Sequence, residues 1–152
     1  MFVFVRGVSF KAMETLIPDL AALDAFAQAF ARRLRPGSAV ALRGLLGAGK
    51  TTLIRALVRA LHGSDAAVSS PTFVFRQRYD GVPPIEHLDL YRITDPAELD
   101  ELGLEDAFGP ECVTLVEWPE HAPDLLPPGA IELGIAGSGD GPRTIAAAEP
   151  AR

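Results

Sequence analysis

The sequence predicts an α/β fold, and three observations support this prediction. Strand-like segments alternate along the chain with segments of helical periodicity, a pattern typical of a sheet with helices on its faces. The glycine-rich turn "GLLGAG" at 44–49 joins a strand-like segment to a helix-like one. The apolar run "CVTLVEW" at 112–118 is typical of a strand buried on both faces of a parallel sheet.

Three segments are expected to be helical. In the first, apolar residues recur at three- and four-residue steps from Pro18, which suits a first helical turn, to the "RPG" stop at 35–37. The second follows the glycine-rich turn and ends at Gly63. The third, "DPAELDEL" at 95–102, opens with an aspartate cap, a proline at the first helical position and a glutamate three residues after the cap.

Strands are expected in the remaining patterned segments. They are "SAVALR" (38–43), "TFVFRQRY" (72–79), "IEHLDL" (85–90), "AIELGI" (130–135) and "RTIAAA" (143–148), besides 112–118. The opening "FVFV" is either a short strand or, because Met13 follows, part of an extension ahead of the true start. We expect residues 1–152 to form one domain, with 1–12 as an optional N-terminal extension, 136–152 less firmly assigned and the final "EPAR" frayed.

Composition indicates an ordinary globular protein. Of its 152 residues, 48% are hydrophobic and 22% are charged, so the chain can bury a core without cross-links. Cys112 is the only cysteine, which favours a reducing compartment. No apolar run is long enough to span a bilayer and "MFVFVRGVSF" lacks the basic start of a signal peptide, so we expect a cytoplasmic protein without a membrane partner. A net charge of −6 argues against a large nucleic-acid-binding face, although a local basic patch around Arg76 and Arg78 stays open.

The segment "GLLGAGKT" at 44–51, called the phosphate loop below, fits the pattern G-x-x-x-x-G-K-[ST]. Its glycines let the backbone fold around an anion, and the helix that follows adds its positive end. Lys50 is expected to reach the β- and γ-phosphates, and the Thr51 hydroxyl to ligate Mg²⁺. The predicted nucleotide-binding residues of this segment are Leu46, Gly47, Ala48, Gly49, Lys50, Thr51 and Thr52. The alternative is a glycine-rich turn with a solvated lysine, which the flanking strand and helix disfavour.

Two acids are candidates to complete this site, because a phosphate loop needs a carboxylate to hold Mg²⁺ or its water. Glu117 ends the strand-like "VTLVE" and Asp89 ends "IEHLD", so both can lie at the sheet edge where ligands bind. Asp89 can instead be a solvated acid, and Glu117 a partner of an arginine such as Arg92. His87 is expected to be a packed strand histidine.

The nucleotide is expected to be ATP. The chain contains no asparagine and therefore no N-K-x-D segment for guanine. Thr72 is either a threonine near the γ-phosphate or part of a turn before a strand. The sequence allows the ring of Trp118 to cover a pocket as an aromatic lid.

Five motifs occur in the order seen in a known protein family, namely "GLLGAGKTT", "SPTF", "HLDLYR", "DPAELDELGLED" and "LVEWPE". On these motifs the chain resembles the TsaE (YjeE) family, the bacterial P-loop ATPases of tRNA threonylcarbamoyladenosine synthesis. The resemblance extends from about Pro18 to about Ile135. The phosphate loop is generic, whereas "HLDLYR" with "LVEWPE" at this separation is specific to the family. The resemblance implies a single P-loop NTPase-like domain whose mixed, mostly parallel sheet is flanked by helices. One departure is Leu45, where the family usually has aspartate.

The resemblance also implies an activity and partners. The protein would bind and hydrolyse ATP with Mg²⁺, slowly when alone, so that the TsaB–TsaD complex can reset between turnovers. TsaB and TsaD attach threonylcarbamoyl to adenosine 37 of tRNAs that read codons beginning with A, so tRNA would be met only indirectly.

By position, Thr51 and Glu117 resemble the family's Mg²⁺ ligands, and Asp89 resembles its essential acid near the metal or the attacking water. The implied metal ligands are thus Thr51, Glu117 and Asp89, and the implied catalytic residues are Asp89, Glu117 and Lys50. Trp118 and Glu120 follow as nucleotide-side residues, and Leu20, next to Asp19, as a residue bordering the adenine.

Two other functions compete with this one. A small-molecule P-loop kinase usually has an arginine-rich lid over its acceptor, and none is evident in the sequence. A nucleotide-gated binding module without turnover is disfavoured because Asp89 and Glu117 are both present.

Overall fold

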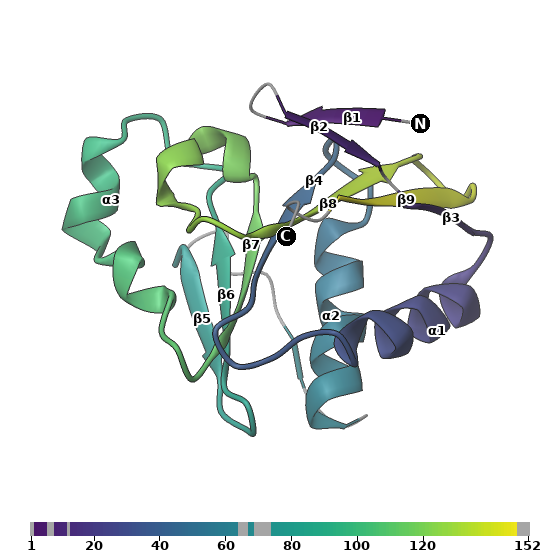
Figure 1. Ribbon diagram of the computed structural model, residues 1–152, viewed down its shortest axis with the longest axis horizontal. Coiled ribbons are helices and arrows are strands. Elements are labelled where there is room, and N and C mark those ends of the chain that lie inside the picture. The colour runs from purple at the N-terminus through teal and green to yellow at the C-terminus, as the bar shows by residue number, and fades with distance from the viewer. Residues whose placement is uncertain (1, 6–7, 12, 64–66, 69–73, 149–152) are drawn as a thin grey trace.

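The computed structural model describes residues 2–5, 8–11, 13–63, 67–68 and 74–148. Its centre is a seven-stranded sheet with the order β3-β9-β8-β4-β7-β6-β5 (Figure 1). The strands are β3 (Met13–Ile17), β4 (Ala39–Arg43), β5 (Arg76–Tyr79), β6 (Ile85–Asp89), β7 (Val113–Glu117), β8 (Ile131–Ala136) and β9 (Arg143–Ala148).

The sheet is mixed. The neighbours β8, β4, β7 and β6 pair in parallel, whereas β5 is antiparallel to β6, β9 to β8, and β3 to β9. Five of the seven strands therefore run in one direction, namely these four and β3. The structure confirms the α/β prediction and the mixed, mostly parallel sheet.

Helices cover the sheet on both faces. The helices α1 (Leu20–Ala31) and α2 (Lys50–His62) pack against each other on one face (Figure 1). The short helix α3 (Ala97–Leu102) and turns of 3-10 helix at 104–107, 119–121 and 123–125 follow β6 and β7. On β4, Val40 and Leu42 contribute to the core beneath α1 and α2, whereas Ala41 belongs to a second core cluster with Leu99 of α3. This alternation follows from the two-residue period of a strand.

The helix boundaries partly correct the predictions. The cap of α1 is Asp19, whose Oδ1 accepts a hydrogen bond of 2.8 Å from the Ala22 amide, so Pro18 precedes the helix instead of opening it. This helix ends at Ala31, four residues before the "RPG" stop. The cap of α2 at Gly63 is confirmed.

The predicted cap of α3 is wrong by one residue, because Pro96 and not Asp95 is the cap, although Asp95 and Glu98 both make hydrogen bonds at the start of the helix. The Asp95 carboxylate accepts from the Ala97 amide at 2.9 Å, and Glu98 Oε1 accepts from the Asp95 amide at 2.9 Å. These bonds satisfy two amides around the start of the helix, which begins at Ala97, one residue after Pro96. The hydrogen bond from the Asp95 amide, together with those from the Thr94 amide and hydroxyl, holds the pKa of Glu98 below its usual value.

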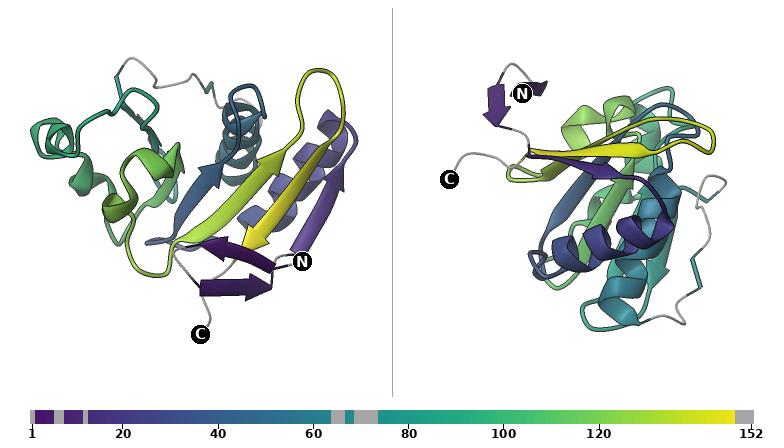
Figure 2. Two further views of the ribbon diagram at one scale, coloured as in Figure 1. Left: turned by 90° about the horizontal axis from the view of Figure 1, so that it is seen from above. Right: turned by 90° about the vertical axis from the view of Figure 1, so that its right-hand side faces the viewer.

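Strand predictions failed mainly at the edges of the sheet. The strand β3 was not anticipated; it lies beside β9 at one edge (Figure 2). At the other edge, β5 begins only at Arg76, because Phe75 has a left-handed backbone with φ of 62°. Residues 72 and 73 of the predicted strand lie outside the described residues, as does the tail 149–152. The backbone of "FVFV" forms β1 (Phe2–Val5), which pairs with β2 (Val8–Lys11) in a separate antiparallel sheet. No helix in the described ranges is long and apolar enough to cross a bilayer.

Candidate nucleotide-binding site

The phosphate loop joins β4 to α2 at the carboxyl edge of the parallel strands. Gly49, the cap of α2, has a φ of 102°, a conformation that side-chain-bearing residues rarely adopt. At Gly44 a Cβ atom would lie 2.8 Å from the Ile135 carbonyl oxygen, which leaves no room for a side chain. The two glycines are therefore required by the path of the loop, as the motif predicts.

The sheet register brings the two predicted acids together. Asp89 and Glu117 are paired residues at the ends of the neighbouring strands β6 and β7, and each is only 3% exposed. The Thr51 hydroxyl, in the first turn of α2, lies 2.9 and 3.1 Å from the two carboxylate oxygens of Glu117. Asp89 Oδ1 accepts a hydrogen bond of 2.9 Å from the Tyr91 amide. All three predicted metal ligands thus border the same space at the first turn of α2.

These residues border an open cavity of about 380 Å³, called the carboxylate cavity below. Its lining consists of Leu46, Gly47, Gly49, Lys50, Thr51, Thr52, Asp89, Tyr91, Glu117 and Trp118. Residues of the loop, of the start of α2 and two acidic residues therefore border one space. That combination suits an anion accompanied by a hard cation.

Lys50 is largely buried, with 5% of its surface exposed. Its Nζ donates to the carbonyl oxygens of Gly44 at 2.7 Å and Leu45 at 3.0 Å and lies 3.8 Å from the centroid of the Trp118 ring. Burial lowers the pKa of Lys50, and the nearby carboxylate of Glu117 opposes that shift. An anionic ligand in the carboxylate cavity would raise the pKa again, because it favours the charged ammonium.

His87 has a polar role that the sequence prediction missed. The side chain is fully buried, as expected, but its Nε2 lies 2.8 Å from Glu117 Oε1, and its Nδ1 lies 3.5 Å from the Tyr79 hydroxyl. Since an ionised carboxylate only accepts hydrogen bonds, Nε2 is the donor to Glu117. The period of two along β6 places residues 87 and 89 on the same face, and this was a usable signal.

The oxygen donors at this point fit Mg²⁺. This ion usually takes one or two protein carboxylates and completes its shell with phosphate oxygens and water. Thr51 supplies a hydroxyl, and Glu117 and Asp89 supply carboxylates from neighbouring strands. Within the described ranges, no group of three or more His, Cys, Asp or Glu side chains can hold a metal alone.

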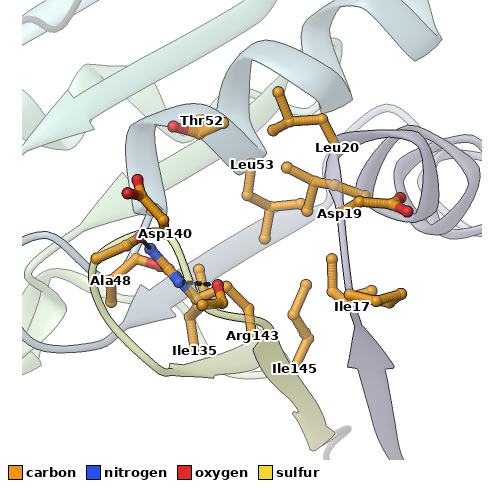
Figure 3. A pocket seen from close by; sticks show the side chains of 15 residues that line it. Ile17, Asp19, Leu20, Ala48, Thr52, Leu53, Ile135, Asp140, Arg143 and Ile145 are labelled. Atoms are coloured by element: carbon orange, nitrogen blue, oxygen red, sulfur yellow. Dashed lines mark hydrogen bonds between the residues drawn. The ribbon is translucent and has the colours of Figure 1, made fainter.

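A second cavity of about 330 Å³, called the apolar cavity below, adjoins the loop (Figure 3). Its wall includes Ile17, Leu20, Leu53, Ile135 and Ile145. Gly49 and Thr52 border both cavities, so the two spaces meet at the first turn of α2. An apolar wall of this kind suits the flat ring of a base. Asp19 and Leu20, which the resemblance implies as neighbours of the adenine, belong to the lining of this cavity.

Of the two residues expected on the nucleotide side after β7, Trp118 lines a cavity and Glu120 does not. Trp118 borders the carboxylate cavity, and its ring lies 4.9 Å from that of Tyr91 and 5.7 Å from that of His121, measured between centroids. Glu120 is not part of the lining of either cavity; its carboxylate lies 3.5 Å from Arg43 Nη1. Tyr91 borders the cavity and was not anticipated. Thr72 lies outside the described residues.

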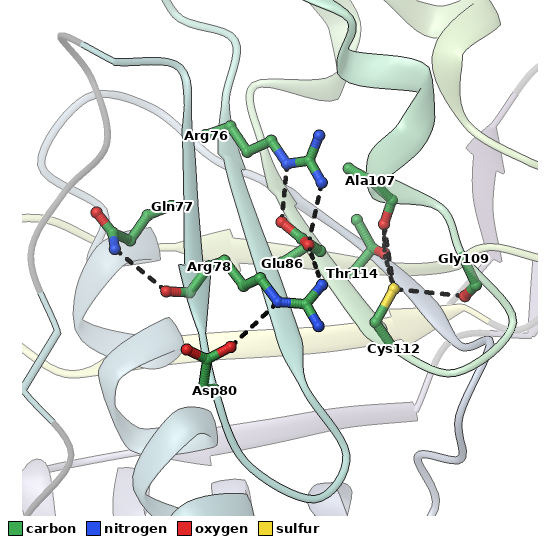
Figure 4. Close-up of polar contacts among 9 residues, drawn as sticks. All are labelled: Arg76, Gln77, Arg78, Asp80, Glu86, Ala107, Gly109, Cys112 and Thr114. Carbon is green, nitrogen blue, oxygen red and sulfur yellow. Dashed lines mark hydrogen bonds and ion pairs between the residues drawn. The ribbon is translucent and has the colours of Figure 1, made fainter.

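The basic patch left open by the sequence is neutralised. Arg76 donates to Glu86 at 2.9 and 3.1 Å, and Arg78 Nη1 donates to the same carboxylate at 2.8 Å (Figure 4). Glu86 is 1% exposed, so its charge is committed to these two guanidinium groups, and its hydrogen bonds raise the pKa of both arginines. Arg78 also pairs with Asp80 at 3.2 Å. These residues do not form a free basic surface.

Comparisons with known proteins identify the family of this chain. The family model described as "Threonylcarbamoyl adenosine biosynthesis protein TsaE" matches residues 17–145. A TsaE protein of Rickettsia bellii is 42% identical to this chain, and the match covers 72% of this chain and 76% of that protein. A TsaE protein of Bacillus subtilis is 39% identical, and the match covers 80% of this chain and 75% of that protein. The crystal structure of YdiB from Bacillus subtilis superimposes with a TM-score of 0.76 at 31% identity, covering 93% of this chain and 88% of that one.

Proposed function

Because the chain belongs to the TsaE family, we propose that it binds ATP with Mg²⁺ and hydrolyses it in support of tRNA threonylcarbamoyladenosine synthesis. The observation that carries this proposal is the contact of Thr51 with both oxygens of Glu117, with Asp89 paired beside it. A phosphate loop that only capped a helix would not need two buried acids at its mouth.

Each residue of the carboxylate cavity has a distinct part in this proposal. Magnesium, when bound with the nucleotide, supplies positive charge that stabilises the phosphoryl group in transfer. Thr51 and Glu117 are the residues we expect to hold it, because hydroxyl and carboxylate oxygens are the ligands it prefers. Asp89, at the next strand end, can orient the attacking water. The ammonium of Lys50 can pair with phosphate oxygens once it leaves the carbonyls of its own loop.

The apolar cavity supports an adenine nucleotide as the ligand. It adjoins the loop at Gly49 and Thr52, so a base there is connected to phosphates in the carboxylate cavity. We propose that Leu20 borders the base and that Trp118 lies near the phosphates. Glu120 can act from outside the cavity by holding Arg43.

We further propose that the protein acts in the cytoplasm with TsaB and TsaD and meets tRNA only through them. The net charge of −6 and the pairing of Arg76 and Arg78 with Glu86 support an indirect encounter with tRNA. Phosphate recognition requires clustered, uncommitted cations.

The decisive experiment measures phosphate release from ATP by the protein alone and with TsaB and TsaD added. We expect weak activity alone that rises with the partners. Lys50→Ala should abolish binding, whereas Asp89→Asn and Glu117→Gln should lower turnover at least about tenfold with a smaller loss of ADP binding, because they act on the metal and the water. Asp100→Asn, an exposed acid on α3, is the matched control.

Two results would overturn the proposal. One is normal ATP hydrolysis in both acid variants. The other is strong activity that ignores the partners and depends on a small acceptor molecule, which would indicate a kinase.

A further inference from the structure

Arg143, the first residue of β9, connects the phosphate loop to the loop between β8 and β9 (Figure 3). Its Nε donates to the Ala48 carbonyl at 2.8 Å, and Nη2 lies 3.5 Å from the Gly47 carbonyl. The same guanidinium donates to carbonyls of the β8–β9 loop, namely those of Ser138 at 3.3 Å, Gly139 at 2.8 Å and Gly141 at 2.5 Å. A planar fork with five N–H groups can serve acceptors of two loops at once.

Peptide geometry gives this contact a consequence for the loop. The Ala48 carbonyl and the Gly49 amide belong to one trans peptide, so they point in opposite directions. Because Arg143 holds the carbonyl, the Gly49 N–H must point away from the guanidinium. Gly49 has a φ of 102°, and glycine has wide backbone freedom, so the peptide needs an external restraint to keep one orientation.

The direction of that amide follows from the two cavities. Arg143 borders the apolar cavity and is not among the residues lining the carboxylate cavity. Gly49 borders both. Because Gly49 borders both cavities and Arg143 only the apolar one, we infer that an amide turned away from Arg143 faces the carboxylate cavity, where a phosphate chain would lie.

We propose that Arg143 is a positioning residue for nucleotide binding: by holding the Ala48 carbonyl, it keeps the Gly49 amide directed at the phosphates. The inference rests on the proposed function only in that the loop must bind a nucleotide. Arg143 does not itself touch phosphate in this scheme. The competing explanation is that Arg143 only forms part of the wall around the base.

The amide signal of Gly49 separates these explanations. An N–H that donates to a phosphate oxygen moves downfield in proton NMR, and at saturating ADP this shift does not depend on affinity. We expect a large downfield shift of Gly49 when ADP saturates the wild-type protein, and loss of most of it in Arg143→Ala and Arg143→Lys. Lysine keeps the charge but is a point donor without the planar fork. ADP affinity should fall roughly tenfold in both variants, the size expected when a charged hydrogen bond is lost.

The matched control is Arg59→Ala, which removes a half-exposed arginine paired with Asp24 on the surface. It should leave the Gly49 signal as in the wild type. If Arg143→Ala does not fold, Arg143→Lys provides the same comparison, and the remaining amide signals report folding in each case.

Three outcomes would overturn the inference. A Gly49 shift that survives in both variants would leave Arg143 as a wall of the apolar cavity. If Arg143→Lys keeps the wild-type Gly49 shift and Arg143→Ala loses it, the positive charge at this position, and not the planar fork, orients the amide. ADP-induced shifts elsewhere in the wild type, without one at Gly49, would show that this amide does not meet phosphate. A wild-type spectrum unchanged by ADP would instead contradict the proposed function itself.

Discussion

Replacing Thr51 by valine tests how the carboxylate cavity is built, because valine has nearly the same shape but no hydroxyl. In the structure that hydroxyl donates to a carboxylate, Glu117, that is 3% exposed and has His87 as its other partner. Hydrogen bonds to charged groups contribute about 1.5–3 kcal/mol, and leaving a buried acceptor without a donor costs a similar amount. We therefore expect Thr51→Val to lower the free energy of unfolding by about 1.5–3 kcal/mol.

Thermal unfolding measures this loss directly. For a domain of about 150 residues, each kcal/mol shifts Tm by about 2–4 °C, so the expected decrease is about 3–12 °C. The variant should also lose the additional stabilisation that Mg²⁺ gives in the presence of ADP, because the hydroxyl is an expected ligand of the metal. Thr51→Ser keeps the hydroxyl and should retain most of both effects.

The result that would refute this reasoning is specific. If Thr51→Val unfolds within about 1 °C of the wild type, less than the smallest shift worked out above, the contact with Glu117 does not stabilise the fold. If Mg²⁺ stabilises the ADP complex of the variant as strongly as that of the wild type, Thr51 is not a ligand.

Two further predictions concern Lys50 and His87. Burial lowers the pKa of Lys50 in the free protein below the usual lysine value of 10.5, whereas bound phosphates favour the charged form. ADP affinity should therefore be full at lower pH. It should decline as pH rises through the pKa that Lys50 has in the free protein. Titration calorimetry across this range checks the decline, and a flat profile would contradict it. His87→Leu removes the second donor to Glu117 and should destabilise the protein by about 1–3 kcal/mol in urea unfolding, whereas His87→Gln, which can donate, should destabilise it less. If the two variants are equally stable, the hydrogen bond from His87 to Glu117 does not stabilise the protein.

The features that sequence could predict are those encoded locally. The phosphate loop has a fixed spacing, and the strand before it and the helix after it have clear periods, so both emerged where expected. Asp89 and Glu117 were predictable as strand-end acids, because carboxyl ends of parallel strands share one edge. The start of α1 was misjudged by two residues, since Pro18 and the Asp19 cap are competing start signals in adjacent positions.

The features that sequence could not predict depend on distant pairing. The strand β3 has mostly exposed side chains and no clear alternation, and it exists as a strand because it pairs with β9, more than a hundred residues later. His87 and Glu117 are separated by 30 residues, and Arg143 and Ala48 by 95. The two-residue period of β6 shows that residues 87 and 89 share a face, but no local pattern identifies Glu117 as the partner of His87 or Ala48 as the partner of Arg143.

The meeting of the two cavities at Gly49 and Thr52 has a consequence for the chain as a whole. A nucleotide that fills both spaces contacts the start of α1 near Leu20, the first turn of α2, and the end of β7 at Glu117. It then acts as a noncovalent cross-link between segments that are close together only after the sheet has assembled. Such a ligand binds the native chain and not the unfolded one, so it suppresses global opening increasingly as its free concentration rises above Kd. Amide hydrogen exchange should therefore slow upon binding even in strands that never touch the nucleotide.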